Sequence, residues 1–495
     1  MARDRILFLS SNGTGLGHLT RSMAIARRLD ASLEPLFFTL SGAAPVVAQQ
    51  GFRVEFAASY ATPTAGSDWR WSRRLRGRLR AVMREADPRV LVFDGAHPYQ
   101  ALVDAMPSVP NAHRVWCRRP MWKPGSNVGA LERTRFFDQV LEPGEFAASE
   151  DRGATVALRD GAHCVDPVVF CEDSELLDRA DAERELGIEP GGVSVLVQLG
   201  QGDEVREASE RCLRHLAGRD GVRVAALRSA LAAMEGVPEG VVSLDSTYPM
   251  SRYLHAFDAT VSAGGYNAYH ELIRFGVPSL FVPMRRQTDD QYARARFAED
   301  VGVGLRASGP VDPALEAKLD DLLDPKARAS MRAALAAIQP ANGAAPAAEW
   351  LAALAGTDRI RKPGTKPWRR YAEHPVASAR AAAPFAARVP GAVGRIAHQT
   401  VTRPTARLLV DAQGLDPAGV EKRLSSVLRE EGVEPERVLV LTDRVEVLPV
   451  LRKAGVGAEH LVAPERRNLI LADRPLIKRV VKLSETGSVD TLAGQ

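Results

Sequence analysis

Short apolar runs alternate with amphipathic stretches through the first third of the chain. The stretch LTRSMAIARRL, directly after the first run, has helical periodicity, and residues 69–86 have the pattern of a basic helix. Strands that alternate with helices predict a parallel, doubly wound α/β sheet over residues 1–165. The apolar runs that we expect to form its buried strands are residues 5–11, 33–41, 51–59, 89–95 and 113–119.

The same pattern restarts near residue 192 and predicts a second Rossmann-like unit over residues 166–355. Each of the two units opens with a strand, a glycine turn and a helix, which favours a duplicated architecture with a cleft between the units. In open sheets of this kind, ligands bind beyond the carboxyl ends of the strands. The strands expected in the second unit are residues 192–203, 222–228, 240–246, 257–265 and 277–284.

The remainder of the chain is predicted to hold a linker, residues 356–404, and a small α/β domain, residues 405–495. The segment 357–407 has eleven Lys and Arg against two Asp and Glu, with several prolines and interleaved aromatic residues. This composition fits attraction to an anionic membrane surface, whereas the prolines favour the alternative of a flexible linker. The small domain has no glycine-rich phosphate loop, so the sequence assigns it no chemistry.

Composition, net charge and cysteine content limit the classes of protein to which the chain could belong. The chain has 495 residues, 45% of them hydrophobic and 25% charged, as in a soluble multidomain protein. A net charge of +4 gives no argument for a nucleic-acid partner. The four cysteines form no CxxC pair, which indicates free thiols in a reducing compartment. Without an apolar run long enough for a signal peptide or a membrane span, we expect a cytoplasmic protein.

The first glycine loop, SSNGTGLGHLTR, lies between a strand and a helix and contains Gly15 and Gly17. Backbone amides freed by glycines at a helix N-terminus can bind an anion, although an ordinary tight turn stays open. The spacing differs from the dinucleotide fingerprint GxGxxG, which disfavours a nicotinamide cofactor. His18 opens the helix, where the dipole keeps an imidazole neutral, as a general base requires. Asp94, after the fourth strand, is the second candidate base, and a structural role for His18 is the alternative.

Further glycines follow strands of the second unit, and they predict a diphosphate site. Glu271, two turns into the next helix, is expected to accept hydrogen bonds from a ribose. The loop after the following strand offers side chains that can pair with sugar hydroxyls, namely Asp289, Asp290 and Gln291. Together with Gly15 and Gly17 of the first loop, the residues expected near the diphosphate are Gly200, Gly202, Ser262, Gly264 and Gly265.

Candidates for the acceptor side lie in the first unit. His97 could face the cleft or cap the next helix, and the two readings are equally supported. In WCRRPMWKPG, residues 116–125, the side chains of Arg118, Arg119 and Trp122 fit a charged, phosphate-bearing acceptor, whereas a solvated basic loop is the plain alternative. No Asp-x-Asp pair suited to Mg²⁺ follows a strand, so we predict no metal and no cofactor.

Two segments of the chain resemble a known family. Residues 248–306, YPMSRYLHAFDATVSAGGYNAYHELIRFGVPSLFVPMRRQTDDQYARARFAEDVGVGLR, resemble the donor domain of GT-B nucleotide-sugar glycosyltransferases. The nearest match is the MurG-like N-acetylglucosaminyltransferase family that completes the peptidoglycan lipid precursor. The motif GTGLGH is similar to that family's first glycine loop. The likeness spans residues 1–355 and does not extend to the C-terminal part.

The resemblance implies a role for each matching residue. The glycines of the second unit would surround the donor diphosphate, Met250 would lie where the base binds, and Glu271 would hold the ribose. Asp290 and Gln291 would hold the transferred sugar, and His18 would stand at the family's acceptor-side histidine. Three positions depart from the family pattern: LGQGD replaces a Gly-Gly-Ser turn, Asp290 replaces Gln, and Arg294 replaces Asn.

The expected activity is therefore metal-independent, inverting transfer of a sugar from a nucleoside diphosphate donor, UDP-N-acetylglucosamine-like, to an acceptor hydroxyl. A lipid-linked acceptor, a role in cell-envelope biosynthesis and attachment at the inner face of the cell membrane belong to the same expectation. Two alternatives stay open. One is a nucleotide-sugar hydrolase or epimerase on the same fold, and the other is a non-catalytic nucleotide-sugar-binding accessory protein.

Overall fold

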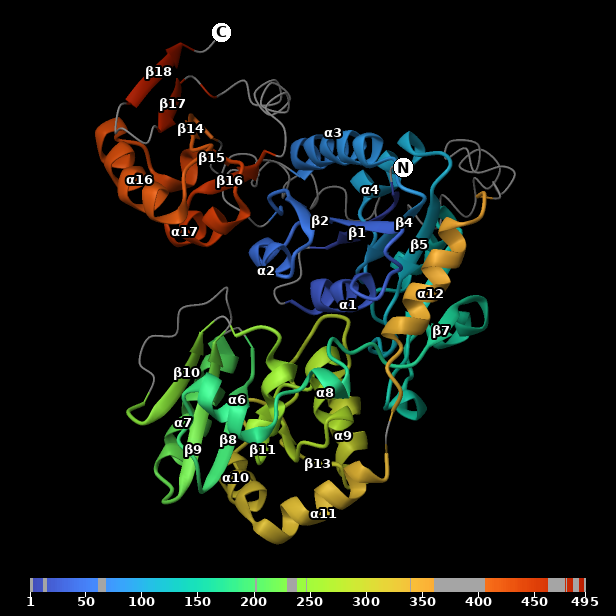
Figure 1. Cartoon of the computed structure of the whole chain (residues 1–495), viewed down its shortest axis with the longest axis vertical. Helices are drawn as coiled ribbons and strands as arrows, with labels where there is room; N and C mark the ends of the chain where they lie inside the picture. Colours follow the sequence, from blue (N-terminus) through green and yellow to red (C-terminus); the bar gives the residue numbers. More distant parts are fainter. Residues whose placement is uncertain are drawn as a thin grey trace, which may run out of the picture.

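The computed structural model contains three α/β units, coloured along the chain in Figure 1. It describes residues 3–11, 16–60, 68–200, 203–228, 238–245, 247–338, 340–359, 406–461, 477, 479–483 and 489–493. Two predicted diphosphate residues, Gly15 and Gly202, and most of the basic segment 357–407 lie outside these ranges. In the ranges that are described, no helix has the length and apolar character that a bilayer span needs.

The first unit is a seven-stranded parallel sheet in the order β3-β2-β1-β4-β5-β6-β7, which confirms the doubly wound sheet predicted for it. Apolar side chains fill both faces of the central strands, as expected for a sheet covered by helices on both sides. Its strands are β1 (Asp4–Ser10), β2 (Leu33–Thr39), β3 (Arg53–Phe56), β4 (Val90–Asp94), β5 (His113–Cys117), β6 (Gln139–Pro143) and β7 (His163–Val165). Its helices are α1 (Gly17–Ala26), α2 (Ala44–Gln49), α3 (Asp68–Ala86), α4 (Gln100–Ala105) and α5 (Val128–Leu131), with 3-10 turns η1 (Met106–Ser108), η2 (Glu132–Phe136), η3 (Ala148–Glu150) and η4 (Val156–Gly161).

The second unit is a six-stranded parallel sheet in the order β10-β9-β8-β11-β12-β13. Its core has two layers, one on each face of the sheet. The strands are β8 (Val193–Gln198), β9 (Val222–Arg228), β10 (Val241–Asp245), β11 (Ala259–Ser262), β12 (Ser279–Phe281) and β13 (Gly304–Arg306). The helices are α6 (Arg179–Leu186), α7 (Asp203–Ala217), α8 (Tyr266–Arg274), α9 (Gln291–Asp300), α10 (Leu315–Leu323) and α11 (Pro325–Ala336), with 3-10 turns η5 (Asp173–Glu175) and η6 (Met250–Ala256).

The chain crosses between these two units twice, at adjacent points. It leaves the first unit after β7 and returns through α12 (Ala344–Ala355), which packs on α1 and the first sheet. Gly343 N donates to Pro167 O at 3.0 Å, and Asn342 exchanges two hydrogen bonds with the Val169 backbone. A Cβ on Gly343 would lie 1.9 Å from Asp166 O, so only glycine fits here. The range 166–355 that the sequence predicts for the second unit thus ends in a helix that packs on the first.

The third unit is a five-stranded sheet in the order β16-β15-β14-β17-β18, of which only the β17–β18 pair is antiparallel. Figure 1 shows it beside α3 and β2 of the first unit. Arg78 of α3 links the two units, because it pairs with Glu55 of β3 at 2.6 Å and with Glu459 of β16 at 3.5 Å. The elements are β14 (Leu408–Asp411), α16 (Pro417–Glu431), η7 (Pro435–Arg437), β15 (Val438–Thr442), η8 (Val445–Val447), α17 (Leu448–Lys453), β16 (Gly457–His460), β17 (Arg479–Leu483) and β18 (Val489–Ala493).

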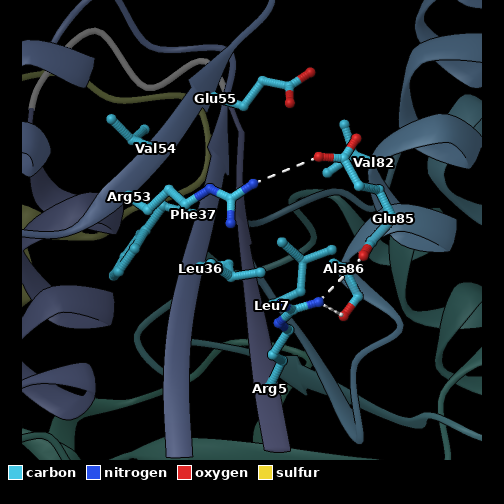
Figure 2. A pocket seen from close by; sticks show the side chains of 10 residues that line it. All are labelled: Arg5, Leu7, Leu36, Phe37, Arg53, Val54, Glu55, Val82, Glu85 and Ala86. Carbon is cyan, nitrogen blue, oxygen red and sulfur yellow. Dashed lines mark hydrogen bonds and ion pairs between the residues drawn. The ribbon is translucent and has the colours of Figure 1, made fainter. Parts of the chain in front are cut away.

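A pocket lies between the first sheet and α3 (Figure 2). Its charged side chains engage one another: Arg53 reaches Glu85 at 3.4 Å, and Arg5 donates to the backbone carbonyls of Glu85 and Ala86. None of the residues singled out in the sequence lines this pocket. The candidate site therefore lies elsewhere, at the junction of the first two units.

Candidate functional site

The junction brings together the N-terminal ends of α1 and α8, which lie 250 residues apart in the chain. Asn267 Nδ2, in the first turn of α8, donates to Gly17 O at the start of α1 at 3.1 Å. Nearby, Tyr248 donates from its hydroxyl to Thr20 Oγ1 at 3.1 Å. Both helices follow the carboxyl end of a strand, where open α/β sheets bind ligands. Two loops that the sequence singled out separately thus meet in space.

His18, in the first turn of α1, lies against Asp94 at the carboxyl end of β4. Because β4 pairs directly with β1, Asp94 is held beside the strand that leads into α1. His18 Nδ1 lies 2.6 Å from Asp94 Oδ1, and Arg21 donates to both oxygens of Asp94 at 2.9 and 2.5 Å. The Asp94 and Arg21 side chains are each only 1% exposed, whereas that of His18 is 18% exposed. The imidazole is therefore the accessible end of a buried charged triad.

Burial, rather than the neighbouring carboxylate, favours a neutral His18. Burial lowers the pKa of His18, although the hydrogen bond that His18 donates to Asp94 opposes that shift. Burial alone would raise the pKa of Asp94, but Arg21 and His18 together lower it to about 2. An ionised Asp94 accepts the Nδ1–H of His18, which leaves the Nε2 lone pair free to take a proton. Since both Asp94 oxygens are already engaged, the geometry favours His18 as base and Asp94 as the group that orients it.

Arg21 was missed by the sequence analysis, although a signal existed. It follows His18 by three residues on α1, and side chains at that spacing lie on one helical face. An arginine there must reach the same strand end as His18. Its role is to keep Asp94 ionised in a buried place.

Two glycines of the second unit lie side by side at the carboxyl edge of the sheet. Gly200 follows β8 with φ +90° and Gly264 follows β11 with φ +67°, backbone conformations that favour glycine. The pairing of Ser262 with Gln198 sets the two turns next to each other. Gly265 is the N-cap of α8, so the backbone amides in the first turn of this helix point at the junction. Ser262, a predicted diphosphate contact, is instead only 1% exposed and lies beneath the turn.

The two residues expected near the nucleoside occupy different environments. Met250 opens η6 and packs in the core of the second unit. Glu271 of α8 is half-buried next to Phe170 and Ser251. Burial raises the pKa of Glu271 to about 7, although the Phe170 N–H and the Ser251 hydroxyl both stabilise the carboxylate. Glu271 is thus a titrating group that faces the segment joining the two units.

The acidic loop requires a correction to the expectation that its side chains face a sugar. Asp289 pairs with Arg119 of the first unit at 3.0 Å and with Arg294 at 2.8 Å. Asp290 caps α9 by accepting from Ala293 N at 3.1 Å. Gln291 is buried: its Oε1 accepts from Met284 N at 3.0 Å and its Nε2 donates to Asp289. These contacts follow from the loop's place at the interface, where buried carboxylates need cationic partners.

Asp289 belongs to a buried chain of charges across the junction, here called the interunit network: Arg119, Asp289, Arg294, Glu145 and His270. Arg294 is 0% exposed and donates to Glu145 Oε2 at 2.8 Å, while His270 Nε2 lies 3.1 Å from the other Glu145 oxygen. Burial would raise the pKa of Glu145, but Arg294 and His270 lower it to about 2. Arg119 and Glu145 come from the first unit and the other members from the second. The network therefore holds the two units in register.

Of the residues predicted on the acceptor side, only Arg119 reaches the junction. Arg118 is fully buried and donates to Glu142 at 3.1 Å, and Trp122 packs in the core of the first unit. The expectation that these two side chains bind an acceptor is wrong, because β5 ends at Cys117 and the chain then turns inward. His97 is exposed, with Nδ1 3.4 Å from Asn127 Oδ1. The backbone of 121–123 pairs with 288–290, which closes this side of the junction.

A metal site is not evident at the junction. Among the residues that the structure describes, no group of three or more His, Cys, Asp or Glu side chains could hold a metal ion. Positive charge at the junction comes from arginines. The chemistry that the described residues offer is proton transfer at His18 and anion binding by backbone amides.

Known proteins resemble this chain in one segment and in fold. Residues 212–346 match the glycosyltransferase family 28 C-terminal domain. A solved UDP-glucosyltransferase from Polygonum tinctorium, capable of glucosylating indoxyl, is 15% identical with a TM-score of 0.51 over 72% of this chain and 100% of that one. The spinosyn forosaminyltransferase SpnP is 16% identical with a TM-score of 0.50 over the same shares. No curated protein matches the chain.

These likenesses establish the class of fold. The chain has the GT-B fold, two Rossmann-like α/β units, with a small α/β domain after them. The family 28 match covers most of the second unit, where the glycine turns and α8 lie. Together, the fold and the matched segment support a glycosyltransferase.

Proposed function

We propose that the protein transfers a sugar from a nucleoside diphosphate donor to an acceptor hydroxyl, with inversion and without a metal ion. The observation that carries this proposal is the position of His18. Its imidazole is backed by Asp94 and lies at the same junction as the glycine-led N-terminus of α8. A base and an anion-binding helix end are the two parts that such a reaction needs.

The reaction proceeds by a single displacement. The acceptor hydroxyl gives its proton to His18 Nε2 while its oxygen attacks the anomeric carbon of the donor. The bond from that carbon to the diphosphate oxygen breaks, and the leaving group takes the electron pair. Asp94 stabilises the imidazolium that forms, as a buried carboxylate does for a catalytic histidine. Amides at Gly200, Gly264 and Gly265 stabilise the charge that develops on the diphosphate.

The donor site would use residues of the second unit. Glu271 accepts hydrogen bonds from the ribose, and η6, which starts at Met250, lies where the base binds. Gln291 is the residue of the acidic loop nearest the glycines, because its Nε2 lies 3.8 Å from a Cβ placed on Gly265. A UDP-N-acetylglucosamine-like donor, a lipid-linked acceptor, a role in the cell envelope and attachment to a membrane surface complete the proposal.

A ligand screen followed by turnover assays tests this function. We expect UDP or UDP-sugars to raise the melting temperature, because a ligand that binds the folded state stabilises it. Donor consumption that depends on an added hydroxyl acceptor and survives EDTA supports transfer. Turnover without acceptor would instead identify a hydrolase or epimerase. Binding without any turnover, unaffected by His18→Ala, would identify an accessory protein.

A further inference from the structure

The charged side chains at the junction balance one another, and this leaves the donor's charge unmatched. Arg21 is paired with Asp94, and two further arginines, the half-buried Arg119 and the buried Arg294, are paired with Asp289 and Glu145. Burial lowers the pKa of His18, and both ring nitrogens of His270 are engaged in hydrogen bonds. A nucleoside diphosphate brings about two negative charges to this place. Backbone amides alone would have to meet them.

One arginine beside the glycine turns is not engaged in this balance. Arg286 lies in the loop after β12 and is half-buried, and its Nη2 is 3.9 Å from a Cβ placed on Gly200. Within the described ranges, it makes neither a hydrogen bond nor an ion pair. Strand order explains its position: β12 pairs with β11, which pairs with β8, so the loops after all three strands meet at one edge.

We propose that Arg286 binds the diphosphate of the donor and supplies the positive charge that the junction otherwise lacks. This inference rests on the proposed function and assigns a residue to it. A guanidinium presents two parallel N–H groups to phosphate oxygens, and such contacts are strong when the site is partly shielded from water. The contact strengthens as the glycosidic bond breaks, because charge then accumulates on the leaving diphosphate.

A binding experiment separates this role from a general effect of positive charge. Calorimetric titration with UDP, dTDP and uridine would be carried out on the full chain and on Arg286→Ala, Arg286→Lys and Arg285→Ala. Arg285, the adjacent residue, is exposed and serves as the matched control. We expect Arg286→Ala to weaken binding of the preferred diphosphate at least tenfold and to leave uridine binding unchanged. Arg286→Lys should recover part of the loss, and Arg285→Ala should stay within twofold of the wild type.

The outcomes distinguish this assignment from the proposed function. If the wild type binds a nucleoside diphosphate and Arg286→Ala binds it equally well, the assignment is wrong while the proposed function stands. An equal loss in Arg285→Ala would also overturn the assignment, since the effect would then be unspecific charge. Failure of the wild type to bind either diphosphate would overturn both. Because Arg286 has no partner in the described residues, its removal should leave the melting temperature unchanged, which checks that the variant is folded.

Discussion

Two histidines at the same junction show how similar residues serve different purposes. His18 and His270 both contact a buried carboxylate that is held by a buried arginine. At His270, however, Nδ1 bonds to Tyr266 O at 2.7 Å and Nε2 to Phe146 N at 3.0 Å, and the side chain is 1% exposed. At His18 only Nδ1 is engaged by a carboxylate, and the ring keeps an accessible face.

The two clusters contain similar residue types. What distinguishes the candidate functional cluster is a histidine ring nitrogen that, within the described ranges, has no hydrogen-bond partner. The interunit network satisfies its members with one another and spans two units, which suits a structural role. The triad of His18, Asp94 and Arg21 lies within one unit, and none of the residues that the structure describes bonds to its His18 Nε2. Four predictions test this difference between the two clusters.

The largest effect is expected at His18. His18→Gln keeps a hydrogen-bonding side chain but removes the base, so kcat should fall about 10³-fold, within the range for general-base catalysis. Nucleotide affinity, measured by calorimetry, should stay within about twofold. The control is His215→Gln, because His215 lies on α7 and pairs with Asp320. A His18→Gln variant that keeps a tenth of wild-type kcat would remove His18 from catalysis.

The second effect concerns stability. Arg294→Met would leave two buried carboxylates, Asp289 and Glu145, without their shared cation, and should lower the free energy of unfolding by about 3–5 kcal/mol. Arg296→Met, on the same helix but 51% exposed, should change it by about 0.5 kcal/mol or less. Denaturant unfolding monitored by fluorescence measures both. Equal stability of the two variants would mean that the interunit network does not hold the units together.

The third prediction is the pH dependence of the reaction. His18 acts only when neutral, and burial lowers its pKa from the ordinary 6.5. At saturating donor, kcat should therefore be constant above pH 6.5 and fall on the acid side of that value. In Asp94→Asn the carboxylate that raises the His18 pKa is lost, so the acid limb should move to lower pH while the rate drops. A limb centred above pH 7 would indicate a different base.

The smallest effect is expected at Glu271, the residue after His270 on α8. Burial raises its pKa to about 7, so the folded state binds this proton more tightly than the unfolded state does. This stabilisation is full below the unfolded pKa of 4.5 and is lost as pH rises through about 7. Glu271→Gln should thus raise the melting temperature at pH 8 and leave it unchanged at pH 4. It should also weaken UDP binding about tenfold at pH 8, and equal affinity would exclude a ribose contact.

Local pattern carried much of the sequence analysis. The rule that ligands gather at carboxyl strand ends selected His18, Asp94 and the glycine turns as candidates. Apolar runs and their periodicity located five of the seven strands of the first sheet and five of the six strands of the second. These inferences succeed because strand burial and helix starts depend on neighbours in sequence. Helical spacing from His18 also held a signal for Arg21, which the sequence analysis did not use.

The errors arose where a partner lies far away along the chain. Asp289 resembles a solvated loop residue until Arg119, 170 positions earlier, is brought beside it. Arg118 likewise resembles a surface cation until its carboxylate, Glu142, arrives from the next strand. Whether a charged side chain faces a ligand or another charge depends on how the two units dock, and no local pattern encodes that docking.

The return of α12 to the first unit has a consequence for how the protein can be made and divided. A helix synthesised after the whole second unit covers α1 and the first sheet, so the first unit is complete only when residue 355 has left the ribosome. A fragment cut after residue 165 would expose apolar surface that α12 normally shields. To express the first unit alone, residues 340–359 would therefore have to be supplied as a separate peptide or joined to the unit in a permuted chain.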